Sequence, residues 1–140
     1  MRAARPRASR STRQLEATYG VLARASDHPS AEAVFRRVRT SLPRVSRGTV
    51  YRNLGKLLEE GRIRLVPSPD RRARYDARLD EHDHFVCTSC GAVIDVPSRS
   101  APRAGVRIEG HLAWEVDQTY RGRCRDCERR GSGRASGARA

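Results

Sequence analysis

The chain has 140 residues, of which 37% are hydrophobic and only 5% aromatic, so it can build one or two small domains whose cores need a further stabiliser such as a metal or a partner subunit. No apolar run approaches the roughly 20 residues of a membrane span, and no apolar stretch follows the basic N-terminus as in a secretory signal, so we expect a cytoplasmic protein with no membrane partner. The net charge is +13, and residues 1–79 carry +12 of it against +1 for residues 80–140. This asymmetry indicates that the first half binds a polyanion such as nucleic acid and that the second half has another task.

The first segments of the chain predict a basic arm and a helix. Residues 1–11 are rich in Arg, Ala, Pro and Ser without periodicity and are expected to be disordered. Residues 12–25 place Leu15, Tyr19 and Leu22 on one face of an amphipathic helix.

Two further helices follow, each with clear boundary signals. Ser30 is a good N-cap for a helix that ends before Pro43, because the residue before a proline avoids the helical conformation. Ser46 caps the next helix, and Gly61 suits its left-handed C-terminal end.

A basic hairpin completes the first domain. Residues 63–66 and 73–76 read as two short strands around a proline-rich turn. Three helices followed by such a hairpin predict a winged helix-turn-helix domain over residues 12–79, which binds double-stranded DNA through its third helix and its wing. The basic and hydroxyl side chains of this domain that are expected to contact phosphates are Arg47, Thr49, Lys56, Arg71, Arg72 and Arg74.

The second half predicts a small α/β domain over residues 80–128, which makes the chain an α/β (α+β) protein. Residues 82–96 hold two strand-like pieces joined at a Cys-x-x-Cys-Gly turn, and residues 116–123 read as a last strand. The apolar positions between 106 and 114 favour a short helix or strand. Residues 129–140 are expected to form a disordered tail.

The four cysteines form two Cys-x-x-Cys pairs, which is typical of a structural zinc site. The 33 residues between the pairs leave room for a small domain. Two disulfides would need an oxidising compartment, and a thioredoxin-like redox pair would need a βαβ context that the sequence lacks. All four cysteines belong to this site, so none remains as a nucleophile; the predicted zinc ligands are Cys87, Cys90, Cys124 and Cys127.

A second cluster combines two histidines with nearby carboxylates. His82 and His84 are two residues apart on a predicted strand, so both imidazoles face the same side and can reach one ion. A mixed nitrogen and oxygen ligand set suits Fe(II), Mn(II) or Zn(II). A surface pair of histidines is the alternative.

The sequence resembles the ferric uptake regulator (Fur) family of metal-dependent transcriptional repressors. The resemblance spans residues 12–128 and is carried by His-Pro-Ser-Ala-Glu from His28, Gly-Thr-Val-Tyr-Arg-Asn-Leu from Gly48, and His-Asp-His-Phe-Val-Cys-Thr-Ser-Cys-Gly from His82. It implies a homodimer that is not an enzyme, with an N-terminal winged helix, a C-terminal dimerisation domain and a metal ion at the hinge. The positions that match the family's regulatory site are His28, Asp76, His82, His84 and Asp95. Tyr51 and Arg52 stand at positions that the family uses for base contacts in DNA, although Tyr51 has an alternative role in the core because it borders Val50 and Leu54.

The resemblance is greatest to the peroxide-sensing branch (PerR), because Asp76 and Asp95 match its pattern. In that branch ferrous iron reacts with peroxide and a ligand histidine, here His28 or His82, is oxidised. Iron- and zinc-uptake regulators of the same family are alternatives, although a zinc regulator usually adds a cysteine that this chain cannot spare.

The sequence departs from the family pattern before the last cysteine pair. The strand leading to Cys124 is about three residues short and lacks the histidine of an auxiliary metal site, and residues 97–107 are poor in acids. Two functions of other classes remain alternatives: a zinc hydrolase built on His82 and His84, and a zinc-ribbon module that binds RNA.

Overall fold

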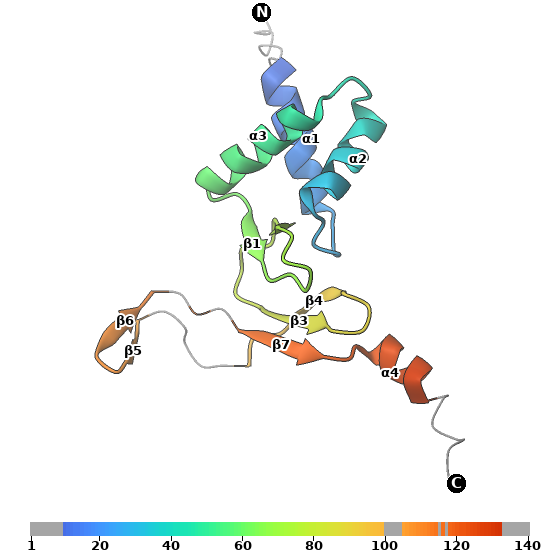
Figure 1. Ribbon diagram of the computed structural model, residues 1–140. Coiled ribbons are helices and arrows are strands. Elements are labelled where there is room, and N and C mark those ends of the chain that lie inside the picture. The colour runs from blue at the N-terminus through green and yellow to red at the C-terminus, as the bar shows by residue number, and fades with distance from the viewer. Residues whose placement is uncertain (1–9, 100–104, 115, 117, 133–140) are drawn as a thin grey trace, which may run out of the picture. The chain divides into compact units, whose positions relative to one another are not determined.

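The computed structural model describes residues 10–99, 105–114, 116 and 118–132. The chain divides into two compact units, which we describe separately (Figure 1). The first unit comprises Met1–Val66 and Ala73–Leu79, and the second comprises Pro67–Arg72 and Asp80–Ala140. Within the described residues, no helix combines the length and the apolar character that crossing a bilayer requires.

The first unit is built on three helices, α1 (Arg10–Ala23), α2 (Ala31–Ser41) and α3 (Arg47–Glu59). Helix α1 packs against both of the others (Figure 1). The predicted first helix is confirmed but begins and ends two residues earlier, so the last two positions assigned to the disordered arm are helical; positions 1–9 lie outside the described residues. The core between the helices consists of Leu15, Leu22, Val34, Phe35, Val38, Val45, Val50, Leu54, Leu57 and Ile63.

The predicted helix boundaries are confirmed by the caps. The Ser30 and Ser46 hydroxyls accept hydrogen bonds from the backbone N–H of Ala33 and Thr49, which satisfies donors that a helix N-terminus leaves open. Gly61 follows α3 with a φ of 64°, the left-handed conformation that glycine adopts without strain.

The hairpin pairs β1 (Arg64–Val66) with β2 (Arg74–Asp76) in antiparallel register. Three helices and this hairpin match the predicted winged helix. On β1, Leu65 is 56% exposed, whereas Val66 occupies the inward position and is buried.

The second unit contains a three-stranded sheet in the order β4-β3-β7. Strands β3 (Asp83–Cys87) and β4 (Val93–Val96) are antiparallel, whereas β7 (Thr119–Gly122) runs parallel to β3. The apolar positions between 106 and 114 form a second hairpin, β5 (Val106–Ile108) and β6 (His111–Ala113), so the strand alternative is the correct one.

Helix α4 (Arg125–Ser132) overturns part of the predicted disordered tail, since residues 129–132 are helical. The acidic side chains of Asp126 and Glu128 lie in its first turn and arginines lie in its last turn. Both interact favourably with the helix dipole and so stabilise the helix. Positions 133–140 lie outside the described residues.

Candidate metal sites and nucleic-acid interface

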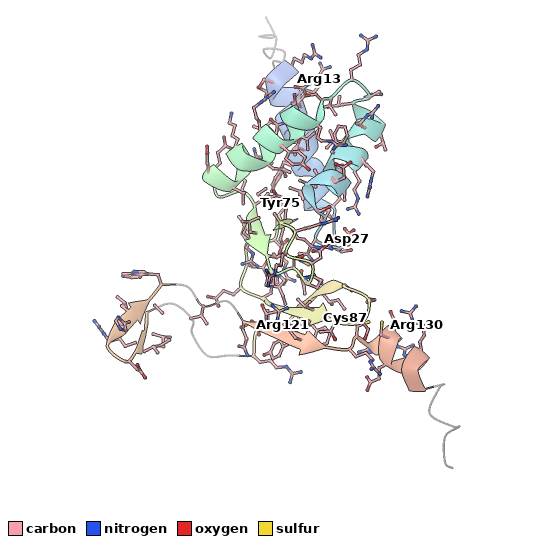
Figure 2. All side chains as sticks on the ribbon, in the orientation of Figure 1. Arg13, Asp27, Tyr75, Cys87, Arg121 and Arg130 are labelled. Atoms are coloured by element: carbon pink, nitrogen blue, oxygen red, sulfur yellow. The ribbon has the colours of Figure 1, made fainter. Side chains whose placement is uncertain are left out.

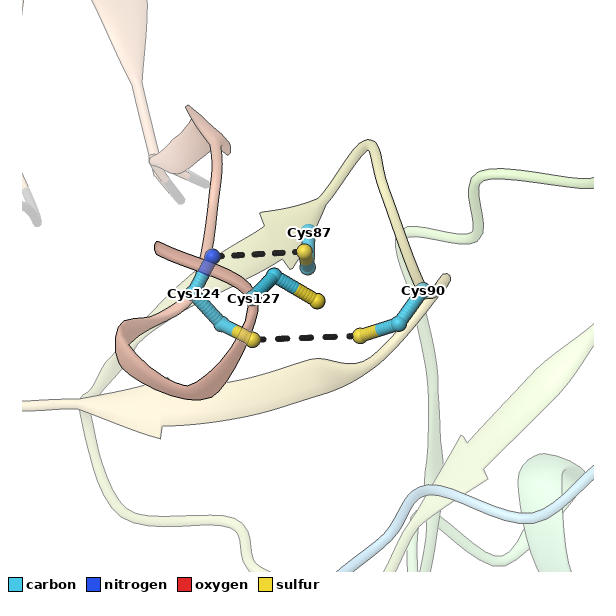
Figure 3. A group of neighbouring side chains, drawn as sticks. All are labelled: Cys87, Cys90, Cys124 and Cys127. Carbon is cyan, nitrogen blue, oxygen red and sulfur yellow. Dashed lines mark hydrogen bonds between the residues drawn. The ribbon is translucent and has the colours of Figure 1, made fainter. Parts of the chain in front are cut away.

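The four cysteines converge in the second unit, as Figure 3 shows. Cys87 is the last residue of β3, Cys90 lies in the turn that follows, Cys124 precedes α4, and Cys127 is in its first turn. Their sulfur atoms all lie within 4.8 Å of one another. The backbone N–H of Cys124 donates to the Cys87 sulfur at 3.2 Å, which fixes one pair against the other.

The spacing of the sulfurs fits a tetrahedral zinc ion. A Zn–S bond of about 2.3 Å gives a tetrahedron whose edges are about 3.8 Å, and the Cys90 and Cys124 sulfurs lie 3.8 Å apart. That separation is far beyond the roughly 2.05 Å of a disulfide bond, and all four thiols are free, so the disulfide alternative is rejected.

The thiols differ in acidity in a way that suits a ligand cluster. The hydrogen bond from the Cys124 backbone N–H lowers the pKa of Cys87 to about 6. Hydrogen bonds with the side chains of Cys124 and Cys90 raise the pKa of Cys127 to about 12. Four crowded thiolates repel one another, and zinc, which binds the thiolate form, would compensate for that repulsion.

Strands β3 and β4 bring three of the predicted regulatory ligands together in the second unit. His82 and His84 direct their Nε2 atoms to within 3.1 Å of each other. The Asp95 carboxylate, on the neighbouring strand opposite His84, approaches these two nitrogens at 3.2 and 3.7 Å. Metal–ligand distances near 2.1 Å place adjacent ligand atoms about 3.0–3.4 Å apart. Two of the three separations lie in this range and the third, 3.7 Å, exceeds it slightly, so the trio needs only a small shift to bind one divalent ion.

A backbone carbonyl orients His82 within this trio. Its Nδ1 lies 2.8 Å from the Asp80 carbonyl oxygen, which can only accept, so the ring proton belongs on Nδ1. Nε2 is then left with its lone pair toward His84 and Asp95, the arrangement that metal-binding histidines usually show. Asp80 is a contribution that the sequence pattern did not reveal, because it acts through its backbone.

The other two predicted ligands lie together in the first unit. His28 Nε2 and an Asp76 carboxylate oxygen are 3.6 Å apart, and both side chains are buried. Strand β2 is tied to the loop that carries His28, because the Tyr75 N–H donates to the Pro29 carbonyl and Arg74 forms a bridge with Ser30. Figure 2 places Tyr75 on this strand and Asp27 in the same loop.

Helix α3 presents the predicted DNA-contacting residues on its outer face. Tyr51 is 47% exposed, so its alternative role in the core is rejected. Arg52 is exposed and donates to the Thr49 hydroxyl at 3.3 Å. Arg47 pairs with Glu32 at 3.2 Å and lies over the Phe35 ring, so it also joins α3 to α2.

The remaining predicted DNA contacts are spread over the end of α3 and the wing. Lys56 is exposed, and its Nζ lies 3.8 Å from the Glu60 Oε1. Arg71 and Arg72 are exposed in the turn between the two wing strands, with Arg71 in a left-handed conformation, whereas Arg74 is half-buried on β2.

Known proteins resemble the chain over most of its length. The model of the Ferric uptake regulator family matches residues 7–118. Transcriptional regulator FurA of Mycobacterium tuberculosis is 36% identical over 107 residues, which cover 74% of this chain and 73% of the relative. The Peroxide operon regulator of Bacillus subtilis is 26% identical over 129 residues, or 86% of each chain.

Solved structures share the fold. The peroxide stress regulator of Campylobacter jejuni superposes with a TM-score of 0.68 at 24% identity, covering 84% of this chain and 90% of the other. The fold, the matching family model and the FurA relative agree: the chain belongs to the ferric uptake regulator family.

Proposed function

We propose that this chain is a metal-dependent transcriptional repressor that binds double-stranded operator DNA as a homodimer. The observation that carries the proposal is the set of three histidines and two aspartates, all buried except the half-buried Asp95, together with a first half of the chain that holds +12 of the net charge. A repressor works at the chromosome, which places the protein in the cytoplasm, and no catalytic role is proposed.

Cys87, Cys90, Cys124 and Cys127 hold a structural zinc ion in this proposal. The 3.8 Å distance between the Cys90 and Cys124 sulfurs supports this assignment. The sheet beside these cysteines has few buried apolar side chains among the described residues, so a bound zinc ion would contribute to its stability. The Zinc Uptake Regulator solved in complex with zinc and DNA shares the fold at a TM-score of 0.60 and 21% identity.

His28, Asp76, His82, His84 and Asp95 are proposed to bind one regulatory ion, Fe(II) or Mn(II), with Zn(II) as a further candidate. A bound divalent cation supplies positive charge that attracts all five ligands at once. Two of these ligands belong to the first unit and three to the second. An ion bound by all five would therefore select one orientation of the winged-helix domain relative to the second unit. In a dimer that orientation fixes the separation of two α3 helices, so metal occupancy is converted into DNA affinity.

The DNA-reading residues are proposed to divide into two groups. Tyr51 and Arg52 are exposed on α3 and suit base edges, through a thymine methyl contact and a hydrogen-bonded guanine respectively. The basic and hydroxyl side chains around them suit phosphates. This second group consists of Arg47, Thr49, Lys56, Arg71, Arg72 and Arg74.

The aspartates at positions 76 and 95 favour a peroxide-sensing regulator over an iron- or zinc-uptake regulator. In this proposal His28 and His82 would hold ferrous iron, and peroxide that oxidises either ring by adding one oxygen would remove a ligand and weaken the binding of the ion. A zinc hydrolase leaves the +12 net charge of residues 1–79 unexplained, and a zinc-ribbon module that binds RNA would not depend on a second metal ion.

Titration of operator DNA tests the proposal. DNA from the chain's own promoter is titrated with protein in Fe(II), Mn(II) or Zn(II), with and without peroxide. We expect a footprint that needs a second metal beyond zinc, and a gain of one oxygen on the peptide holding His28 or His82 after peroxide with Fe(II). RNA bound as tightly as duplex DNA, or binding that no second metal affects, would contradict it.

A further inference from the structure

Arg130 reaches back along α4 to the zinc-binding end of the helix. Its Nη2 lies 3.6 Å from the Cys127 sulfur, and its Nε donates to the Asp126 carbonyl at 3.2 Å. Positions 127 and 130 are one turn apart on the same helix face, so this contact needs no distortion of the helix. Figure 2 shows Arg130 on α4, in the same unit as Cys87.

The contact matters because of the charge that the cysteines carry. A zinc ion bound by four thiolates leaves a net charge of −2 on the site. A guanidinium N–H is a charged donor, and hydrogen bonds from charged donors are stronger than neutral ones. The Asp126 carbonyl holds the guanidinium in place, so its charge stays beside Cys127 instead of turning into solvent.

Cys127 is one of the two ligands that the fold leaves open to solvent. It lies half-buried in the first turn of α4 and Cys90 is exposed, whereas Cys87 and Cys124 are buried. The Cys87 sulfur already accepts a backbone N–H, from Cys124. Arg130 is the donor that the structure records for the Cys127 sulfur from outside the cluster, among the residues it describes.

We propose that Arg130 is a positioning residue of the structural zinc site, which holds Cys127 on the metal and slows zinc loss. This inference rests on the zinc site proposed above. Partners that orient metal ligands typically change metal affinity by about 10–100-fold when removed. Cys127 is the ligand expected to leave the metal first when Arg130 is replaced.

The test compares Arg130→Met, Arg130→Lys and Arg129→Met in the full-length protein. Arg129→Met is the matched control, because Arg129 is exposed one position earlier on the same helix. Zinc transfer to a colorimetric chelator is followed in time, and Co(II)-loaded protein is examined for its sulfur-to-cobalt charge-transfer band. Circular dichroism checks that each variant keeps its helices.

We expect Arg130→Met to lose zinc about 10-fold faster than wild type and to shift the cobalt band. Arg130→Lys should restore much of the retention, since lysine keeps a charged donor, and Arg129→Met should match wild type. Equal rates and bands in Arg130→Met and Arg129→Met would overturn the inference while leaving the zinc site intact. A wild-type protein that holds no zinc would instead contradict the zinc site itself, and the inference with it.

Discussion

His82 and His84 face each other across 3.1 Å through their Nε2 atoms, and the Asp80 carbonyl holds the opposite nitrogen of His82 at 2.8 Å. Two imidazole lone pairs directed at one point are favourable only when a cation or a shared proton lies between them. The Asp80 contact leaves the Nε2 lone pair of His82 facing His84, where it can accept the Nε2–H of His84 or bind a cation. A divalent ion at this point would take the lone pairs of both rings, with Asp95 as a third ligand.

Removal of Asp95 tests the ligand trio. We expect Asp95→Ala to weaken Mn(II) binding by at least about 100-fold, because it deletes the carboxylate beside both histidines. Glu81→Ala is the control, since Glu81 is an exposed acid next to His82. Isothermal titration calorimetry of zinc-loaded protein measures the Mn(II) affinity of both variants. Equal losses of affinity would show that Asp95 acts only through its negative charge and not as a metal ligand.

Arg52 is expected to contribute to sequence recognition. We expect Arg52→Ala to weaken specific operator binding by about 1–3 kcal/mol and nonspecific binding by less. Arg36→Ala removes an exposed charge from α2 instead and serves as the control. Fluorescence anisotropy on operator and scrambled duplexes separates the two effects; equal losses on both duplexes would assign Arg52 to phosphate contacts.

A buried polar contact joins α1 to α3. The Thr18 hydroxyl is fully buried, donates to the Gln14 carbonyl at 2.8 Å and accepts from the Asn53 amide at 3.2 Å. We expect Thr18→Val to lower the free energy of unfolding by about 1–2 kcal/mol, because the amide loses its acceptor. Thr40→Val, at an exposed hydroxyl on α2, should change it far less in urea unfolding. Because valine and threonine have similar helix propensities, similar losses in both variants would show that the hydrogen bond from Asn53 does not determine the cost.

The Glu16–Arg62 ion pair predicts a pH-dependent contribution to stability. Two hydrogen bonds from Arg62, which also lies over Tyr19, lower the pKa of Glu16 below its ordinary value of 4.5. A lowered carboxyl pKa stabilises the fold above that value, and the gain is lost as pH falls through the pKa of the folded state. We expect Glu16→Gln to cost only about 0.2–1 kcal/mol at pH 7, since the pair is exposed.

Unfolding in urea at several pH values checks this contribution. The difference in the free energy of unfolding between wild type and Glu16→Gln should vanish at a pH low enough to protonate Glu16 in both the folded and the unfolded protein. Glu59→Gln, at an exposed acid near the end of α3, controls for the loss of one negative charge. A difference that persists in acid would mean that the glutamate acts through packing.

Local chemistry predicted most of the first unit and the cysteine site. Ser30 and Ser46 begin their helices, and Gly61 ends α3, through short-range contacts that follow directly from the sequence. The Cys-x-x-Cys spacing likewise brings two sulfur atoms close enough to bind the same zinc ion. Patterns of this kind depend on residues within a few positions of each other.

Contacts between distant segments could not be predicted from pattern alone. The parallel pairing of β7 with β3 joins segments more than 30 residues apart, and strand periodicity does not say which strand is the neighbour. The role of His28 and Asp76 came from the family resemblance. Helix α4 was missed because its Gly-Ser end resembles a tail, whereas the fixed Cys124 backbone supplies its first turn: the Glu128 N–H donates to the Cys124 carbonyl.

We propose that a second ion, bound by His28, Asp76, His82, His84 and Asp95, controls the affinity for DNA. The most direct measurement is the operator Kd of protein that keeps its cysteine-bound zinc while the second ion is removed and then restored. We predict binding about 5–150-fold weaker without the second ion, regained on adding Mn(II), with no gain in a His84→Ala variant. An unchanged Kd in zinc-retaining protein stripped of the second ion would contradict the account.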